Sequence, residues 1–208
     1  MLFRSIFHKL NSVEKNKMGP KPFISAGGEV LADPATEVDF ENKTVTVKSG
    51  HRFEYDKLVF ATGSVPLIPI FIKGYDLENV FYINKSFSYI STLFEELRDK
   101  KNIIIVGGGF IGAEVAEQLA AHKDKNVTLI EAEEYCFTRA FSTELSKLAT
   151  EQLEQTNTKV LTSSYVEEIA GENGKVRKVM LKGGKEIDAD AVIMSIGYQP
   201  NTELAKKA

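Results

Sequence analysis

The stretch of sequence that decides the fold is Asn102-Ile-Ile-Ile-Val-Gly-Gly-Gly-Phe-Ile-Gly112. The apolar run after Asn102 is of the kind that a parallel strand buried on both faces requires. Glycines at positions 107, 109 and 112 follow, and apolar residues then recur at the spacing of a helix over residues 111–119. A second apolar strand, 127–130, is followed by Glu131, which lies 24 residues after Gly107. This order of strand, glycine turn, helix, strand and acidic residue predicts a Rossmann-like, doubly wound α/β fold that binds a dinucleotide.

Each residue of this pattern has a physical role. Gly107 permits a tight turn, Gly109 lets the main chain approach a pyrophosphate, and Gly112 lets the helix pack closely on the strand. The free N–H groups and the positive end of the helix dipole then hold the phosphates. Glu131 is placed to accept hydrogen bonds from the hydroxyls of the adenine ribose. The alternatives are a purely structural glycine turn and a solvated strand end at Glu131.

The charge around Glu131 favours NADH over NADPH. Glu131, Glu133 and Glu134 would face a 2′-phosphate, and residues 126–138 contain no Arg or Lys. One like-charge contact at about 4 Å costs ~4 kcal/mol at an effective dielectric constant near 20. We therefore expect NADH to be the preferred nucleotide.

Further helices and strands are expected along the chain. A helix over residues 86–100 begins with Ser86 as its cap, and a helix over residues 142–155 turns Leu145, Leu148, Ala149 and Leu153 inward. Short strands are expected at residues 44–47, 52–55, 58–61, 159–161, 165–170, 176–182, 185–187 and 191–196. Gly183 and Gly184 turn a hairpin, so an antiparallel β-meander over about residues 164–188 replaces the usual third crossover helix.

The chain also contains an internal repeat. Residues 45–66 align without a gap on residues 179–200, and Gly63 then matches Gly197 while Pro66 matches Pro200. Val59 and Ile193 are apolar counterparts in the two copies. We interpret the copies as equivalent ends of two related folding units. The glycine turn of the first unit would lie before residue 1, so a fragment is expected: the tail of one dinucleotide fold and nearly all of a second.

Composition excludes several classes of function. The 208 residues are 43% hydrophobic and 26% charged, with 26 Lys and Arg against 29 Asp and Glu. This near balance, without a basic block, argues against nucleic acid as a partner. No apolar run approaches the length of a membrane-spanning helix. A single cysteine, Cys136, forms no internal disulfide, and no Cys/His cluster has the spacing of a metal site.

The N-terminal residues 1–28 are basic and contain several apolar positions. A solvated basic terminus on a cytoplasmic protein is the favoured interpretation. The alternative is a cleavable leader that directs the protein to an organelle matrix.

Several motifs carry a family resemblance. They are Tyr55-Asp-Lys-Leu-Val-Phe-Ala-Thr-Gly-Ser-Val-Pro66, Gly74-Tyr-Asp-Leu-Glu-Asn-Val80, Ile105-Val-Gly-Gly-Gly-Phe-Ile-Gly-Ala-Glu114 and Ile196-Gly-Tyr-Gln-Pro-Asn201. Over about residues 38–208 the chain resembles the FAD-dependent pyridine nucleotide-disulfide oxidoreductases, within them the branch of NADH oxidases and coenzyme A-disulfide reductases. The resemblance implies a homodimeric flavoenzyme in which NADH reduces FAD and electrons pass to a small acceptor: a disulfide, persulfide, peroxide or oxygen.

The resemblance also implies roles for particular residues. Ala61, Thr62 and Gly63 match the turn that approaches FAD. The NADH fingerprint covers Gly107, Gly109, Phe110, Ile111, Gly112 and Glu131. Glu114 matches a glutamate near the nicotinamide, and the alternative is a favourable interaction with the helix dipole. Gly197 and Gln199 match the loop beside the nicotinamide, and the alternative for Gly197 is that it ends a strand. The family's redox cysteine would lie before residue 1, and Cys136 is in the wrong domain for that role, so no catalytic residue is assigned.

The expected organisation has three parts. Residues 1–27 match the family poorly, residues 28–71 are a partial FAD-binding domain, and residues 72–208 are the NADH-binding domain. The expected function is that of an NADH-dependent flavoprotein oxidoreductase fragment. The alternative from another class is an NADH-binding module without turnover of its own; an S-adenosylmethionine methyltransferase is disfavoured by the duplicated tail.

Overall fold

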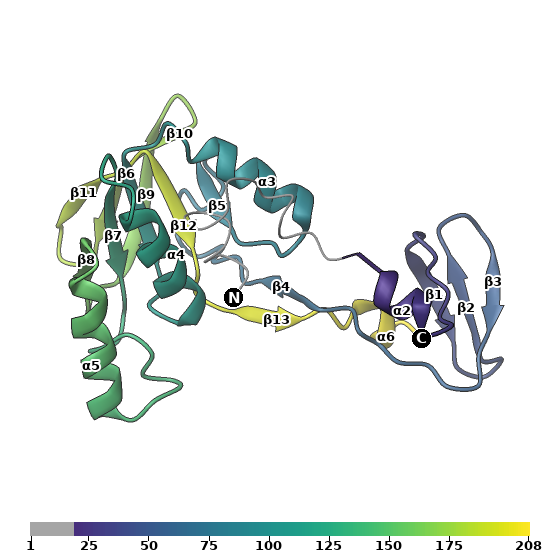
Figure 1. The fold of residues 1–208 in the computed structure, drawn as a ribbon. Helices are drawn as coiled ribbons and strands as arrows, with labels where there is room; N and C mark the ends of the chain where they lie inside the picture. Colours follow the sequence, from purple (N-terminus) through teal and green to yellow (C-terminus); the bar gives the residue numbers. More distant parts are fainter. Residues whose placement is uncertain (1–18) are drawn as a thin grey trace. The chain divides into compact units, whose positions relative to one another are not determined.

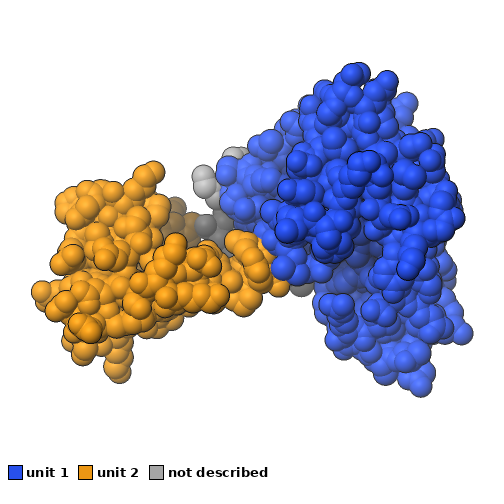
Figure 2. Space-filling model, turned by 180° about the vertical axis from the view of Figure 1, so that it is seen from behind, with its two compact units in different colours: residues 1–17, 66–197 blue, residues 18–65, 198–208 orange. Residues whose placement is uncertain are grey.

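The computed structural model describes residues 19–208 and divides them into two compact units. The larger unit contains Pro66–Gly197, and the smaller contains residues 19–65 together with Tyr198–Ala208 (Figure 2). These limits differ from the expected domain limits, because the division falls at residue 65 instead of 71 and the last eleven residues join the smaller unit. The assignment of one unit to FAD and the other to NADH stays a prediction.

A five-stranded parallel sheet forms the centre of the larger unit (Figure 1). Its order is β5-β12-β6-β7-β8, and every neighbouring pair is parallel. The strands are β5 (Val80–Tyr82), β6 (Asn102–Val106), β7 (Asn126–Ile130), β8 (Thr158–Leu161) and β12 (Ala191–Met194). All of β12, and β6 after Asn102, are buried. The predicted α/β fold with a parallel sheet is confirmed.

Three helices accompany this sheet: α3 (Phe87–Glu96), α4 (Phe110–Ala120) and α5 (Thr143–Glu154). Ser86 caps α3 as predicted, since its Oγ accepts a hydrogen bond from the N–H of Tyr89. The other end of α3 is covered by buried Lys125, whose Nζ donates to the carbonyl oxygens of Leu97, Arg98 and Lys100 at 2.8–3.0 Å. A lysine thus satisfies carbonyl groups that the end of a helix leaves unpaired.

The buried face of α5 differs from the prediction. Leu153 is buried, but Leu145 and Leu148 are 47% and 57% exposed, so the prediction that they face inward is wrong. The buried positions are instead Ser146 and Thr150. The reason is that α5 packs on the loop after β7, where the N–H of buried Cys136 needs an acceptor and finds Thr150 Oγ1 at 2.9 Å.

The predicted β-meander is confirmed. It consists of β9 (Val166–Glu172), β10 (Lys175–Leu181) and β11 (Glu186–Asp188), all antiparallel. Gly183 and Gly184, with φ of +97° and +86°, form the turn between β10 and β11. Apolar side chains of the meander, among them those of Ile169 and Val179, share one core with those of Ile104 and Val192 from the parallel sheet.

The smaller unit is built on a three-stranded antiparallel sheet. Its strands are β1 (Ala35–Asp39), β2 (Thr44–Val47) and β3 (Arg52–Glu54), of which β1 was not predicted. Two short helices, α2 (Lys21–Ser25) and α6 (Glu203–Lys206), belong to the same unit. β4 (Ser64–Pro66) and β13 (Tyr198–Pro200) pair as a separate two-stranded sheet.

The strand predicted at residues 58–61 does not form. These residues pair with no other described strand, and Val59 is 83% exposed. An apolar run becomes a central strand only when neighbouring strands satisfy its N–H and C=O groups on both sides, and the described residues place none there.

Candidate functional site

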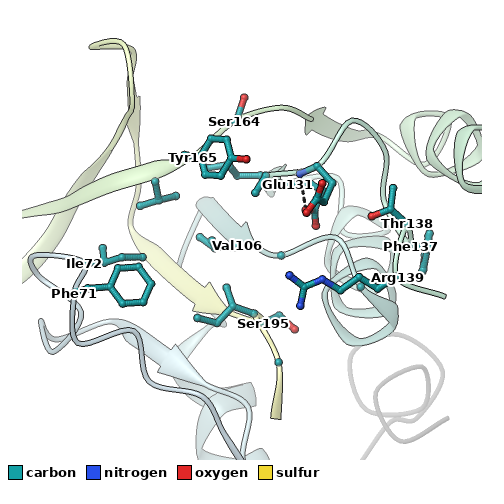
Figure 3. A pocket seen from close by; sticks show the side chains of 18 residues that line it. Phe71, Ile72, Val106, Glu131, Phe137, Thr138, Arg139, Ser164, Tyr165 and Ser195 are labelled. Atoms are coloured by element: carbon teal, nitrogen blue, oxygen red, sulfur yellow. Dashed lines mark hydrogen bonds between the residues drawn. The ribbon is translucent and has the colours of Figure 1, made fainter. Parts of the chain in front are cut away.

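The larger unit contains a cavity of about 470 Å³ at the carboxyl ends of β6, β7 and β12 (Figure 3). It is lined by Phe71–Ile72, Val106, Gly107, Gly109, Ile130–Glu133, Phe137–Arg139, Ser164–Val166 and Ser195–Gly197. The carboxyl ends of parallel strands are where open α/β sheets bind their ligands. Four predicted residues line this cavity: Gly107, Gly109, Glu131 and Gly197.

The glycine turn after β6 has the geometry that its sequence predicts. Gly107 has a φ of +106°, and a Cβ there would lie 2.5 Å from the carbonyl oxygen of Ser195. A Cβ on Gly112 would lie 1.9 Å from the carbonyl oxygen of Gly107. Both positions therefore exclude any larger residue, and the predicted structural roles of Gly107 and Gly112 are confirmed.

Gly109 differs from these two, because nothing lies within 4 Å of the position that its Cβ would occupy. This glycine is not required for packing within the chain, and it leaves open space at the wall of the cavity. It is also the N-cap of α4 and has no side chain to occupy the free N–H groups of the first turn. The residues present thus fit a phosphate group that approaches the main chain at this point.

The carboxylate of Glu131 is held against the glycine turn. Its Oε2 accepts a hydrogen bond from the N–H of Gly108 at 2.5 Å, and its Oε1 accepts one from the N–H of Glu133 at 2.9 Å. Each carboxylate oxygen has a second lone pair available, so the group can still accept hydrogen bonds from two ligand hydroxyls. The carboxylate is therefore oriented before any ligand binds.

The side chain of Cys136 packs against Gly108 of the glycine turn. This side chain is fully buried, and a Cβ on Gly108 would lie 2.6 Å from its Sγ, so Gly108 is also required sterically. Burial raises the pKa of the Cys136 thiol to about 11, against a smaller lowering by its hydrogen bond with Thr150. The thiol is consequently neutral near pH 7 and inaccessible, which agrees with a structural role and not with that of a redox thiolate.

The other predicted site residues do not line the cavity. Phe110, Ile111, Gly112 and Glu114 lie in the first turns of α4. Gln199 lies in β13, and Ala61, Thr62 and Gly63 precede β4; all four belong to the smaller unit. There Thr62 Oγ1 donates to the carbonyl oxygen of Asn201 at 2.5 Å, and Gly63 has a φ of +72°. The assignment of these residues to NADH or FAD stays a prediction.

The sequence analysis missed Arg139, which lines the cavity and extends its side chain into it (Figure 3). Arg139 directly follows residues 126–138, the stretch without Arg or Lys. The acidic character inferred for this region is therefore incomplete. The signal in the sequence is that Arg139 lies in the same loop between β7 and α5 as Glu131. Tyr165 was missed for another reason: only the fold brings the start of the meander to the cavity.

Within residues 19–208 no group of three or more His, Cys, Asp or Glu side chains is placed to hold a metal ion. In the same part of the chain, no helix combines the length and the apolar character needed to cross a membrane.

Comparisons with known proteins agree with this geometry. The family described as "Pyridine nucleotide-disulphide oxidoreductase" matches residues 12–208. An NADH oxidase from Enterococcus faecalis is 32% identical over 203 residues, which cover 94% of this chain and 45% of the relative. The chain thus spans about half the length of this curated relative.

Two solved structures have the same fold. A NAD-dependent persulfide reductase from A. fulgidus superposes with a TM-score of 0.86 at 30% sequence identity. The superposition covers 100% of this chain and 40% of the persulfide reductase chain. A water-forming NADH oxidase from Lactobacillus brevis, solved with bound NADH, superposes with a TM-score of 0.83 at 25% identity, over 99% of this chain and 46% of its own.

Proposed function

The chain belongs to the pyridine nucleotide-disulphide oxidoreductase family, and from that premise we propose that it is part of an NADH-dependent flavoprotein oxidoreductase. In this proposal the larger unit binds NADH in the cavity at the ends of β6, β7 and β12. The smaller unit contributes Ala61, Thr62 and Gly63 to an FAD site. FAD would supply the redox chemistry, taking electrons from NADH and passing them to an acceptor.

The observation that carries the proposal is the oriented carboxylate of Glu131 beside the glycine turn. Hydrogen bonds from the N–H groups of Gly108 and Glu133 fix this carboxylate where it can receive the two ribose hydroxyls. The open wall at Gly109 leaves room for phosphate groups next to the N-terminus of α4. One end of the cavity thus suits a ribose and the adjoining wall suits a diphosphate, as adenosine diphosphate requires.

The acceptor that we propose is a disulfide, persulfide, peroxide or oxygen. Within this range, the names NADH oxidase and NAD-dependent persulfide reductase of two relatives support oxygen and a persulfide. In this chain, the buried neutral thiol of Cys136 is not suited to exchange with a disulfide. A thiol that passes electrons would have to come from elsewhere in the intact protein, for which we propose the homodimeric state of the family.

The nucleotide site is tested by calorimetric titration of NADH into the 208-residue chain and into its Glu131→Ala and Glu131→Gln variants. We expect the wild-type chain to bind and Glu131→Ala to bind at least about tenfold more weakly, because two hydrogen bonds to a charged group are lost. Glu144→Ala, which removes an exposed carboxylate of α5 away from the cavity, serves as the control and should bind like wild type. The proposal is contradicted if the wild-type chain does not bind NADH. It is also contradicted if both Glu131 variants bind NADH as tightly as the wild-type chain.

A second candidate function is an NADH-binding module that has no turnover of its own. It is favoured by the position of Cys136, the single cysteine of the chain, inside the core. Flavin absorbance of the purified protein and NADH consumption with oxygen or a disulfide distinguish the two. Bound flavin with NADH consumption supports the oxidoreductase, whereas colourless protein that binds NADH without consuming it supports the module.

A further inference from the structure

We propose that Arg139 is the cationic contact for the diphosphate of the dinucleotide and does not serve to recognise a 2′-phosphate. This inference rests on the proposed function, because it concerns the same cavity. Among the residues that line the cavity, Arg139 is the single Lys or Arg, and Glu131 and Glu133 are the two carboxylates. Figure 3 shows its side chain extending into the cavity.

Arg139 is not engaged in an ion pair with any residue from 19 to 208. Glu131, an acidic residue of the same cavity, accepts hydrogen bonds from main-chain N–H groups with both of its carboxylate oxygens instead. The guanidinium is therefore a charge in the cavity that no ion pair with the described residues neutralises. Its planar set of N–H donors matches the oxygens of a phosphate group.

The turn that carries Arg139 is fixed to the glycine turn by the main chain. The N–H of Phe137 donates to the carbonyl oxygen of Gly108 at 3.0 Å, immediately after Cys136, which packs under the same glycine. The N–H groups of Ala140 and Phe141 both donate to the carbonyl oxygen of Phe137, at 2.8 and 3.1 Å. Residues 137–141 thus form a closed turn beside the glycine turn.

Aromatic packing holds the same turn against the start of α4. The rings of Phe110, Phe137 and Phe141 contact one another with centroid distances of 5.4, 5.5 and 5.8 Å. Phe110 is the first residue of α4, and the two other rings flank Arg139 in the sequence. The long and otherwise mobile arginine side chain therefore starts from a rigid base next to the N–H groups of the helix.

The position of the turn formed by residues 137–141 determines which phosphate group of a dinucleotide Arg139 contacts. Gly109 and the first turn of α4 provide neutral donors for a diphosphate, and Arg139 adds the formal positive charge that they lack. A 2′-phosphate would instead sit on the ribose, against the fixed carboxylate of Glu131, where it is repelled. We thus expect Arg139 to strengthen the binding of NADH without shifting the preference toward NADPH.

The test compares Arg139→Gln and Arg139→Lys with wild type in calorimetric titrations of NADH and NADPH at low and high salt. The control Lys147→Gln removes an exposed cation of α5 outside the cavity. We expect Arg139→Gln to bind NADH at least about tenfold more weakly and with a weaker dependence on salt, because one charge contact to a phosphate is gone. Arg139→Lys should fall between Arg139→Gln and wild type, and Lys147→Gln should match wild type.

Two results overturn the proposal: a variant Arg139→Gln that binds NADH like wild type, whatever its affinity for NADPH, or one that loses affinity while the salt dependence is unchanged. The second result indicates a merely structural role. If the wild-type chain itself does not bind NADH, the proposed function fails. If wild type binds and Arg139→Gln binds equally well, the assignment of Arg139 alone fails.

Discussion

The two copies of the internal repeat, residues 45–66 and 179–200, begin and end alike but differ in the middle. Each copy contains the turn of an antiparallel hairpin, β2–β3 in the first and β10–β11 in the second. Each ends in a glycine with positive φ, Gly63 or Gly197, and then in a short strand, β4 or β13. Between hairpin and glycine, the second copy forms the fully buried strand β12, whereas the first copy forms no strand.

Even the hydrogen bonds at the ends of the copies are equivalent. The N–H of Leu67 donates to the carbonyl oxygen of Gly197, and at the matching positions the N–H of Asn201 donates to the carbonyl oxygen of Gly63, both at 3.0 Å. Turn and end geometry therefore follow from local sequence. A central strand requires partners as well: β12 lies between β5 and β6, and residues 58–61 have no such neighbours among the described residues.

The largest difference between the copies should appear at the matched positions Val59 and Ile193. Ile193 is fully buried in β12, so Ile193→Ala should lower the free energy of unfolding by about 2 to 5 kcal/mol. Val59 is 83% exposed, and Val59→Ala should change the free energy of unfolding by less than about 0.5 kcal/mol. Urea unfolding followed by circular dichroism measures both. Similar losses in the two variants would show that residues 58–61 are packed as a strand.

The terminal glycines should differ less. Gly197 has a φ of +133° and the Leu67 side chain 3.1 Å from the position of a Cβ, so Gly197→Ala should cost about 2 to 3 kcal/mol. Gly63 has a φ of +72° and open space around it, so Gly63→Ala should cost about 1 kcal/mol. The same unfolding experiment ranks the two. If Gly63→Ala lowered the free energy of unfolding more than Gly197→Ala, the contact between position 197 and Leu67 would not be the more costly one.

The hairpin glycines should respond equally. Gly50 and Gly184 have φ of +90° and +86°, and neither has an atom within 4 Å of a Cβ position. Alanine at either position should therefore cost about 1 kcal/mol, from backbone conformation alone. Unfolding free energies that differ by more than about 1 kcal/mol would break the equivalence of the two hairpins.

The last prediction concerns Cys136, which supports the glycine turn that precedes the second copy. With a pKa of about 11 against an ordinary value of 9.0, the thiol of the folded chain stays protonated over the range in which that of the unfolded chain ionises. A raised pKa stabilises the folded chain below pH 9, and this contribution is lost as the pH rises toward 11.

Alkylation by iodoacetamide measures this difference. The native chain should react far more slowly than the urea-unfolded chain at pH 8 to 9, and its rate should still be rising above pH 9. Equal rates for folded and unfolded chain at pH 8 would show that the thiol is accessible and ionised normally.

Most of the larger unit could be predicted because its signals are local. The apolar run before Gly107, the spacing of the glycines, Glu131 at the end of β7 and the Gly183-Gly184 turn each specify their own element. The same local reasoning placed Gly107, Gly109 and Glu131 together at one edge of the sheet, where the cavity lies.

The features that could not be predicted depend on contacts between distant segments. Leu145 and Leu148 are exposed because α5 must offer Thr150 to the N–H of Cys136, a partner that helical periodicity does not reveal. Gly108 is required because Cys136 and Glu131 both lie against it. Arg139 reaches the cavity through a turn held by three phenylalanine rings, two of them near it in sequence and one at the start of α4.

A crystal structure of the chain grown with NADH would show directly where the nucleotide binds. We predict density for the nucleotide in the cavity of the larger unit, with the ribose hydroxyls on the Glu131 carboxylate and the diphosphate next to Gly109 and the start of α4. Density for NADH anywhere else on the chain, with this cavity left to solvent, would contradict the account.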